Sequence, residues 1–324
     1  MAAHLVLESE SFSWMTPPLS ILSQLGVAFF FISSGFLSAR KAEKLSTPKE
    51  QSKCYLKTAL RHAILYSIWS LFYLMILLAQ WITKKMDIVS NLLLFVRAFF
   101  VGGSYGQLWF LWALIICDLV LALFSLIRLN KWIALAISII LYVACLLLGP
   151  YSLVFRYSNN LAFANLWYFQ AFANSLGRGL LYVVLGLLLA KANHSFHKLP
   201  AILFFLISVI AYSVEFCLLY FLWGAFSATA FTLPFFAFEA MAVCFSFNMP
   251  GKAVYVWMRK MSILVYVLHS GLFILYNQLI KIVVIPSCRG LIPFLIVGSL
   301  TFALSALIVW LSSKPKLKFL HFLY

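Results

Sequence analysis

Long apolar runs that recur along almost the whole chain constrain its fold more than any other feature of the sequence. Each run is close to the roughly 20 residues that an α-helix needs to cross a bilayer core of about 30 Å. Lipid offers the backbone no hydrogen-bond partner, so only helices and closed barrels cross it, and the alternation of barrel strands is not evident here. The sequence therefore predicts an all-α polytopic membrane protein. The expected spans are residues 18–38, 59–82, 106–128, 132–150, 174–190, 199–222, 226–247, 261–280 and 292–312.

Composition supports the same fold class. Hydrophobic residues make up 65% of the chain and charged residues only 10%, far from the usage of soluble domains. The net charge of +16 would suggest a nucleic-acid partner in a soluble protein. Here 17 of the 24 Lys and Arg residues fall on one side of the predicted topology, as the positive-inside rule describes. We therefore expect the lipid bilayer, and no nucleic acid, as a partner.

The basic segment at residues 39–61 sets the predicted orientation. It carries seven Lys and Arg residues, and we expect it to form a cytoplasmic loop. The tail at residues 313–324, with three further lysines, falls on the same side, which places the C-terminus in the cytoplasm. No internal repeat is evident, so residues 1–324 are treated as a single domain of a multi-pass protein of the cell membrane.

Two apolar segments depart from the regular pattern. The span at 18–38 must enter from outside, and Met1 to Leu7 is similar to the outer end of a helix whose inner half is absent. We therefore expect nine to ten helices, with the first one truncated. The shorter run at 88–101 contains Arg97 and is followed by two glycines, which favours an interfacial or re-entrant helix.

Four charged residues fall inside the predicted spans and away from their ends. Asp118, Glu215 and Glu239 are three of only eight acidic residues, and Arg178 is a possible partner for one of them. A charge at the centre of a bilayer costs roughly 2.5 to 3.5 kcal/mol on insertion scales, so each requires a reason. Two interpretations remain open: protonated carboxyls or structural ion pairs between helices, and the lining of a polar cavity that holds a ligand.

Histidine is sparse, and its positions differ in kind. His62 and His321 adjoin basic segments and suit the membrane interface, whereas His4 and His269 belong to apolar helical segments. Desolvation keeps an imidazole neutral, and neutral imidazole is a competent general base, which makes His4 a candidate for that role. The six cysteines form no metal-ligand spacing. No metal and no bound cofactor are expected.

Four short motifs occur in a recognisable order. They are FFFISSGFL (Phe29 to Leu37), which follows His4, then GQLWFLWALI (Gly106 to Ile115), the segment Asn174 to Gly186, and SILVYVLHSGLFI (Ser262 to Ile274). From physics alone, the Ser and Gly residues of the first motif favour close helix packing in lipid. Together the motifs resemble the membrane-bound acyltransferases of the acyltransferase 3 family, which are similar to O-acetyltransferases of surface glycans.

The resemblance implies an architecture of about ten helices and a reaction. In that reaction acyl-CoA, commonly acetyl-CoA, is a co-substrate that gives its acyl group to a hydroxyl of a saccharide or envelope precursor. His4 matches the histidine thought to abstract the acceptor proton. The residues expected to bind the substrate or acyl donor are Ser34, Gly35, Arg40 (or Lys41), Trp109, Asn174 and His269, with Asp118, Arg178 and Glu239 as possible charges of the cavity.

The chain also departs from the family pattern. No Arg or Lys lies about ten residues before His4, Gln107 replaces a histidine, and Ala173 replaces the Arg of an Arg-Asn pair. A non-catalytic member that retains the fold is therefore one alternative. A transporter or flippase is another, although matched Gly or Pro breaks in two halves are not evident. The acceptor, the acyl group, activity and the oligomeric state are not specified by the sequence.

Overall fold

The computed structural model describes residues 16–148, 151, 167–191, 196–222, 230–247, 253–283 and 291–324. Throughout these ranges the regular structure is helical and contains no strand, which confirms the predicted all-α class. The elements are α2 (Thr16–Ala42), α3 (Pro48–Thr83), α4 (Ile88–Val101), η2 (Gly106–Leu108), α5 (Trp109–Leu126), α6 (Lys131–Leu148), α8 (Trp167–Phe172), η3 (Ala173–Gly179), α9 (Leu180–Lys191), α10 (Lys198–Cys217), η4 (Leu218–Leu222), α11 (Leu233–Ser246), α12 (Ala253–Val283), α13 (Leu291–Ser312) and η5 (Pro315–Leu323).

The described helices fit a multi-pass membrane protein. Seven helical stretches among the described residues are long and apolar enough to cross a membrane. The total of nine to ten spans stays a prediction. At 14 residues, α4 is about 21 Å long, which is too short to cross a 30 Å core. Helix α11 is also shorter than the predicted span at 226–247, because the chain at residues 230–232 is not helical and the helix begins only at Leu233.

The prediction of a loop over residues 39–61 is wrong for most of that segment. Helix α2 continues to Ala42, and α3 already begins at Pro48. Thr47 caps α3: its side chain accepts a hydrogen bond from the Glu50 amide, and the Glu50 carboxylate accepts one from the Thr47 amide. Lys, Arg, Glu and Gln are good helix formers, so the charged residues at the end of α2 and at the start of α3 are compatible with helix although they lie outside the apolar runs.

Helices α2 and α9 approach each other unusually closely. A Cβ atom on Gly35 would lie 2.1 Å from the carbonyl oxygen of Val183, and one on Gly186 would lie 2.1 Å from that of Ile32. The two glycines therefore pack reciprocally, each against the backbone of the opposite helix. This is the arrangement that small residues allow when helices associate in lipid.

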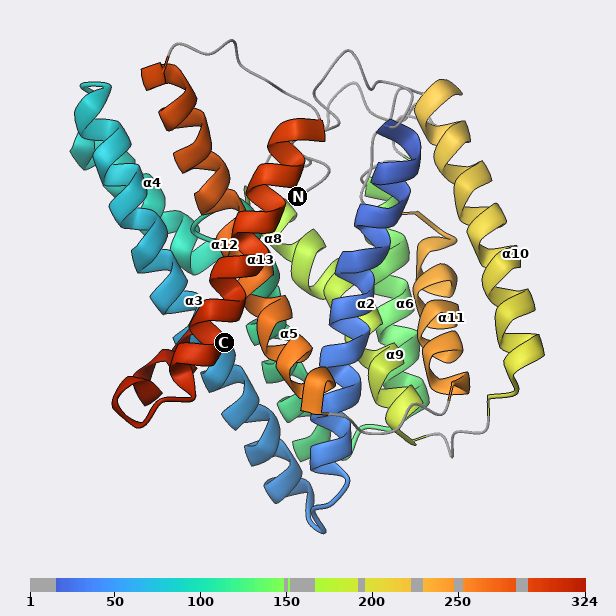
Figure 1. Ribbon diagram of the computed structural model, residues 1–324. Helices are drawn as coiled ribbons and strands as arrows, with labels where there is room; N and C mark the ends of the chain where they lie inside the picture. The colour runs from blue at the N-terminus through green and yellow to red at the C-terminus, as the bar shows by residue number, and fades with distance from the viewer. Residues whose placement is uncertain are drawn as a thin grey trace.

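The helices form a bundle in which α2 and α9 occupy the centre (Figure 1). Helices α10 and α11 pack together on one side, and α3, α4, α12 and α13 lie on the other. At one end of the bundle α2 and α5 finish while α3 and α6 begin. We call this the basic end, because the Lys- and Arg-rich segments flank these helix termini.

The predicted tail at residues 313–324 folds back onto the bundle. Its short helix η5 follows α13 directly. The Trp69 indole donates a hydrogen bond of 3.1 Å to the carbonyl oxygen of Leu323, and the Tyr324 hydroxyl lies 2.6 Å from that of Ser312. The tail thus packs against α3 and the end of α13.

Candidate active site

Three of the predicted site residues meet at one place in the bundle. Arg178 donates a hydrogen bond of 2.5 Å from Nη2 to the side-chain oxygen of Asn174. Its guanidinium carbon lies 4.4 Å from the centre of the Trp109 ring, so the cation stacks on the indole face. Trp109 opens α5, whereas the other two residues belong to η3. We call this group of three the arginine site.

The backbone of η3 is unusual, because residues Ala173–Gly179 form a π-helix that leads into α9. Such wide turns are rare and occur frequently at functional sites. A local hydrogen bond stabilises the turn: the Ser175 hydroxyl donates to the carbonyl oxygen of Ala171 over 2.8 Å. Asn174 and Arg178 are four residues apart and lie on the same side of this turn.

Aromatic side chains surround the arginine site. The Phe31 ring of α2 lies 6.2 Å from Trp109 and 6.4 Å from Tyr182, measured between ring centres. Tyr182 and Tyr142 approach within 3.4 Å through their hydroxyls, and Tyr142 donates to the carbonyl oxygen of Ala230. The arginine site therefore lies in an aromatic, weakly polar setting where α2, α5, α6 and α9 converge.

The other predicted residues of α2 lie apart from the arginine site. Gly35 faces Val183 of α9, and no contact of Ser34 with Arg178 is found among the described residues. Arg40 is exposed, and its guanidinium lies 5.9 Å from the ring centre of Phe36. Helix packing explains Gly35, and the binding roles of Ser34, Gly35 and Arg40 stay predictions.

His269 belongs to a second group that joins α12 to α3 and α5. It is 8% exposed, lies 3.3 Å from the carbonyl oxygen of Val265 through Nδ1, and its ring centre is 6.2 Å from that of Tyr266. The Tyr266 hydroxyl donates 2.5 Å to the backbone oxygen of Gln107. His269 thus lies beside the anchor of the Gln107 segment.

The charges predicted for one cavity are distributed over three places. Asp118 lies 2.7 Å from Nδ1 of His62, a residue that the sequence assigned only to the interface. Glu239 on α11 forms no ion pair within the described part of the chain. Glu215 accepts hydrogen bonds from the amides of Phe231 and Thr232, at the start of α11. These contacts do not join Asp118, Arg178 and Glu239 to one another, and a shared cavity stays a prediction.

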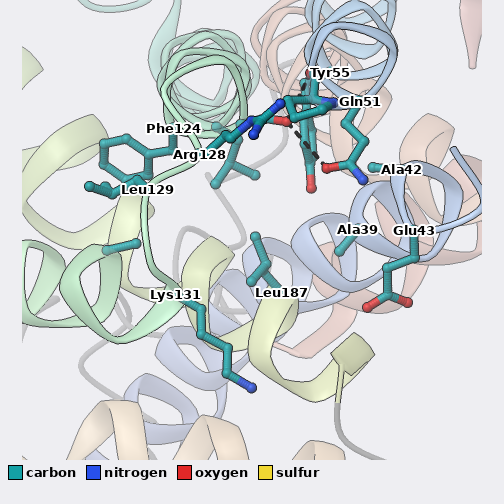
Figure 2. Close-up of a pocket in the computed structure, with 14 residues that line it drawn as sticks. Ala39, Ala42, Glu43, Gln51, Tyr55, Phe124, Arg128, Leu129, Lys131 and Leu187 are labelled. Atoms are coloured by element: carbon teal, nitrogen blue, oxygen red, sulfur yellow. Dashed lines mark hydrogen bonds between the residues drawn. The ribbon is translucent and has the colours of Figure 1, made fainter. Parts of the chain in front are cut away.

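A pocket of about 250 Å³ opens at the basic end (Figure 2). The Ser125 hydroxyl donates to the carbonyl oxygen of Pro48 (3.3 Å) and lies 3.4 Å from the amide oxygen of Gln51, which joins α5 to the start of α3. Charged side chains at the pocket are Arg128, Lys131 and Glu43. The lining is completed by Ala39, Ala42, Tyr55, Leu121, Phe124, Leu129, Ala134 and Leu187.

Arg128 adopts a backbone conformation that glycine usually occupies. Its φ of 53° is in the left-handed region. The amide of Leu129 donates to the oxygen of Phe124, and that of Arg128 to the oxygen of Ser125, which together close the end of α5 as a Schellman motif. A long cationic side chain thus stands where glycine is the common choice, and it faces the pocket.

The proposed base, His4, lies outside the described residues, so its relation to the arginine site stays a prediction. Within the described ranges, no group of three or more His, Cys, Asp or Glu side chains could hold a metal ion. The arrangement can therefore be described by its own polar groups: a stacked arginine, an amide, and a basic pocket at one end of the bundle.

Comparison with known families decides the identity. A model of an acyltransferase domain matches residues 1–312, which is nearly the whole chain. The chain belongs to the acyltransferase 3 family. No curated protein and no solved structure matches it significantly. This acyltransferase 3 protein is thus a multi-pass membrane acyltransferase in general class, as the four motifs predicted.

Proposed function

We propose that this acyltransferase 3 protein transfers an acetyl or other short acyl group from acyl-CoA to a hydroxyl of a saccharide or envelope precursor. The observation that carries the proposal is the pocket at the basic end of a member of this family. The positive-inside rule places that end in the cytoplasm, where acyl-CoA is found. We place the protein in the cell membrane with its C-terminus on the cytoplasmic side.

The donor's phosphates are assigned to the pocket. Arg128 and Lys131 present two cations there, and charge-assisted contacts of this kind bind phosphate oxygens strongly. The left-handed backbone of Arg128 supports the assignment, because strained residues cluster at functional sites. Arg40, the sequence-based candidate, does not line the pocket. We therefore assign phosphate binding to Arg128 and Lys131 first.

The acyl group must travel from this pocket to the arginine site. Leu121 lines the pocket and Trp109 belongs to the arginine site, and both lie on α5. They are 12 residues apart, which corresponds to about 18 Å along the helix. The long pantetheine arm of CoA suits such a path, since it is a flexible chain that carries the thioester at its end. The acceptor then approaches from the opposite, outer end.

The chemistry follows from a single base. His4 takes the proton from the acceptor hydroxyl as its oxygen attacks the carbonyl carbon of the thioester. The carbon–sulfur bond then breaks, and the departing thiolate takes the proton from the imidazolium. The products are an ester of the acceptor and free CoA, and the imidazole is regenerated. General base catalysis of this kind contributes on the order of 10² to 10⁴ in rate.

Mass spectrometry of envelope glycans tests the proposal. Cells with and without the gene are compared, and we expect a mass difference of one acetyl or other acyl group per repeat. Purified protein in lipid nanodiscs, given radiolabelled acetyl-CoA and the deacylated glycan, should transfer the label. His4→Ala should abolish that transfer while leaving insertion intact. Unchanged glycans together with inactive purified protein would favour a non-catalytic member, and changed glycan export without any change in acylation would favour a flippase.

A further inference from the structure

Arg178 is a cation within a membrane-spanning stretch that lacks a counter-ion among the described residues. The 18-residue stretch Ala173–Ala190 is apolar enough to cross a membrane, and Arg178 lies inside it. The one ion pair found between two described residues joins His62 and Asp118. A charge at this depth is expensive and points to function by default.

Three acidic residues of the described helices form no contact with Arg178. Asp118 is paired with His62. Glu215 accepts hydrogen bonds from Phe231 and Thr232 at the start of α11. Glu239 lies on α11 and forms no ion pair with Arg178. No acidic side chain in the described ranges thus neutralises Arg178, and a bound group of negative charge would suit that place.

The guanidinium is also incompletely hydrogen-bonded. Nη2 donates to Asn174, whereas Nε is inaccessible to solvent and has no hydrogen-bond partner among the described residues. A buried donor without a partner costs about 1 to 3 kcal/mol, and more when it is charged. The residue as a whole is only partly buried, so a ligand can reach the terminal nitrogens although it cannot reach Nε. The guanidinium thus has one N–H donor that is hydrogen-bonded and another that has no partner among the described residues. Such an arrangement is expected of a group that binds a ligand.

The surrounding contacts fix the direction of the remaining donors. Trp109 covers one face of the planar guanidinium, and Asn174 holds one of its terminal nitrogens. Tyr182, Tyr142 and Tyr266 lie near enough to interact with it electrostatically. An arginine held in this way presents its other N–H groups in a fixed plane, which suits an oxygen that carries negative charge.

We propose that Arg178 is a catalytic residue that binds the carbonyl oxygen of the acyl group as that oxygen becomes negatively charged. This inference rests on the proposed acyl transfer. When the acceptor oxygen adds to the carbonyl carbon, the carbon–oxygen double bond becomes a single bond and its electron pair moves to the oxygen. The terminal N–H groups of Arg178 that Asn174 does not hold donate to that oxyanion, and the pair returns when the thiolate leaves. An oxyanion inside a low-dielectric protein interacts strongly with such preorganised donors.

The inference predicts a specific kinetic signature. Removing one donor from an oxyanion site lowers kcat by about 10² to 10³. We expect that loss for Arg178→Met, with KM for acetyl-CoA changed less than threefold, because the phosphates bind at the opposite end of the bundle. Arg178→Ala should recover part of its kcat when millimolar guanidinium is added. The matched control is Arg97→Met, which removes an exposed arginine of α4 and should leave kcat unchanged.

A binding measurement separates this inference from the proposed function. Methylphosphonate is a tetrahedral anion close to the size of an acetyl group. It should raise the thermal midpoint of the wild type and of Arg97→Met saturably, but not that of Arg178→Met. If the wild type transfers no acyl group yet methylphosphonate stabilises it through Arg178, the anion site stands and the proposed function fails.

Two results would overturn the inference. The first is a folded Arg178→Met that keeps kcat within threefold of the wild type and binds methylphosphonate equally well. The second is a kcat loss confined to negatively charged acceptors and absent with neutral ones, which would assign Arg178 to the acceptor's charge. An equal loss with both kinds of acceptor supports the oxyanion role. Size-exclusion profiles of the variants confirm that each one is folded.

Discussion

His62 Nδ1 lies 2.7 Å from Asp118 Oδ2 and joins α3 to α5 through the one ion pair found among the described residues. The Asp118 side chain is 3% exposed and that of His62 17%, so the carboxylate depends on the imidazole for its partner. A buried charge that loses its partner is strongly destabilising, whereas loss of both partners together is often tolerated. The pair therefore holds α3 against α5, and both helices contribute residues to the basic-end pocket.

We expect His62→Ala to lower the free energy of unfolding by about 3 kcal/mol, the lower end of the range for broken buried pairs, because His62 is partly exposed. Asp118→Asn should cost less, since an amide can remain hydrogen-bonded. Unfolding in mixed detergent micelles measures both. The double variant should be more stable than the sum of the single effects implies. Strict additivity would show that the two side chains do not interact.

The sequence predicted where helices lie better than where they end. Apolar runs revealed the helices because burial in lipid requires them. The start of α3 was missed by about a dozen residues, since a lysine-rich stretch was interpreted as a loop. The capping box at Thr47 and Glu50 is a sequence signal that was available and would have corrected this.

The side-chain pairings were harder to predict. Asn174, Arg178 and Trp109 were chosen individually, and only the packing of η3 against α5 brings them together. His62 was assigned to the interface because it adjoins a basic segment, and its separation of 56 positions from Asp118 gave no sign of their contact. Periodicity gives the faces of one helix but not the register between two. One signal existed: both residues fall in the half of their spans nearest the basic end.

Gly35→Ala should prevent correct packing of α2 on α9. The new Cβ atom would lie 2.1 Å from the Val183 oxygen, which belongs to rigid backbone. We expect little folded protein after purification in mild detergent. Gly26→Ala in the same helix is the matched control, because nothing lies within 4 Å of its Cβ position. That change should be neutral or stabilising by up to about 1 kcal/mol, as Ala exceeds Gly in helix propensity. Equal yields of the two variants would contradict this.

Arg128→Gly should separate stability from donor binding. A non-glycine residue in the left-handed region costs about 1 to 2 kcal/mol, partly offset by the entropy cost of glycine, so stability should be unchanged or rise by up to about 1 kcal/mol. KM for acetyl-CoA should rise about 10- to 100-fold, because a charge-assisted contact contributes roughly 1.5 to 3 kcal/mol. Steady-state kinetics and thermal unfolding measure the two effects.

Lys85→Gly is the control for that experiment. Lys85 has the same φ of 53° and closes α3 with an equivalent pair of hydrogen bonds, from its own amide to Ile82 and from Met86 to Trp81. It does not line the pocket. Its stability change should match that of Arg128→Gly while KM stays at the wild-type value. A KM increase of equal size in both variants would remove Arg128 from the donor site.

The resemblance leads us to expect a histidine at the position of Gln107, and the contacts of Gln107 explain why an amide suits this chain. Its Nε2 donates hydrogen bonds to the Tyr73 hydroxyl (2.5 Å) and to the carbonyl oxygen of Val267 (3.2 Å). The Tyr73 hydroxyl also accepts a hydrogen bond from the Gly271 amide. One amide nitrogen thus supplies two hydrogens to two acceptors. Either imidazole nitrogen carries only one hydrogen, so a histidine cannot repeat both bonds from a single atom.

We therefore expect Gln107→His to lower the free energy of unfolding by about 1 kcal/mol, the value of one net hydrogen bond, and Gln107→Leu to lower it by about 2 kcal/mol. Because Gln107 joins η2 to α3 and α12 and forms no hydrogen bond with Arg178, kcat should change less than threefold in both variants. Unfolding in denaturant and single-turnover transfer assays measure these effects. A Gln107→His variant with much higher kcat would instead show that the substitution had removed a catalytic group.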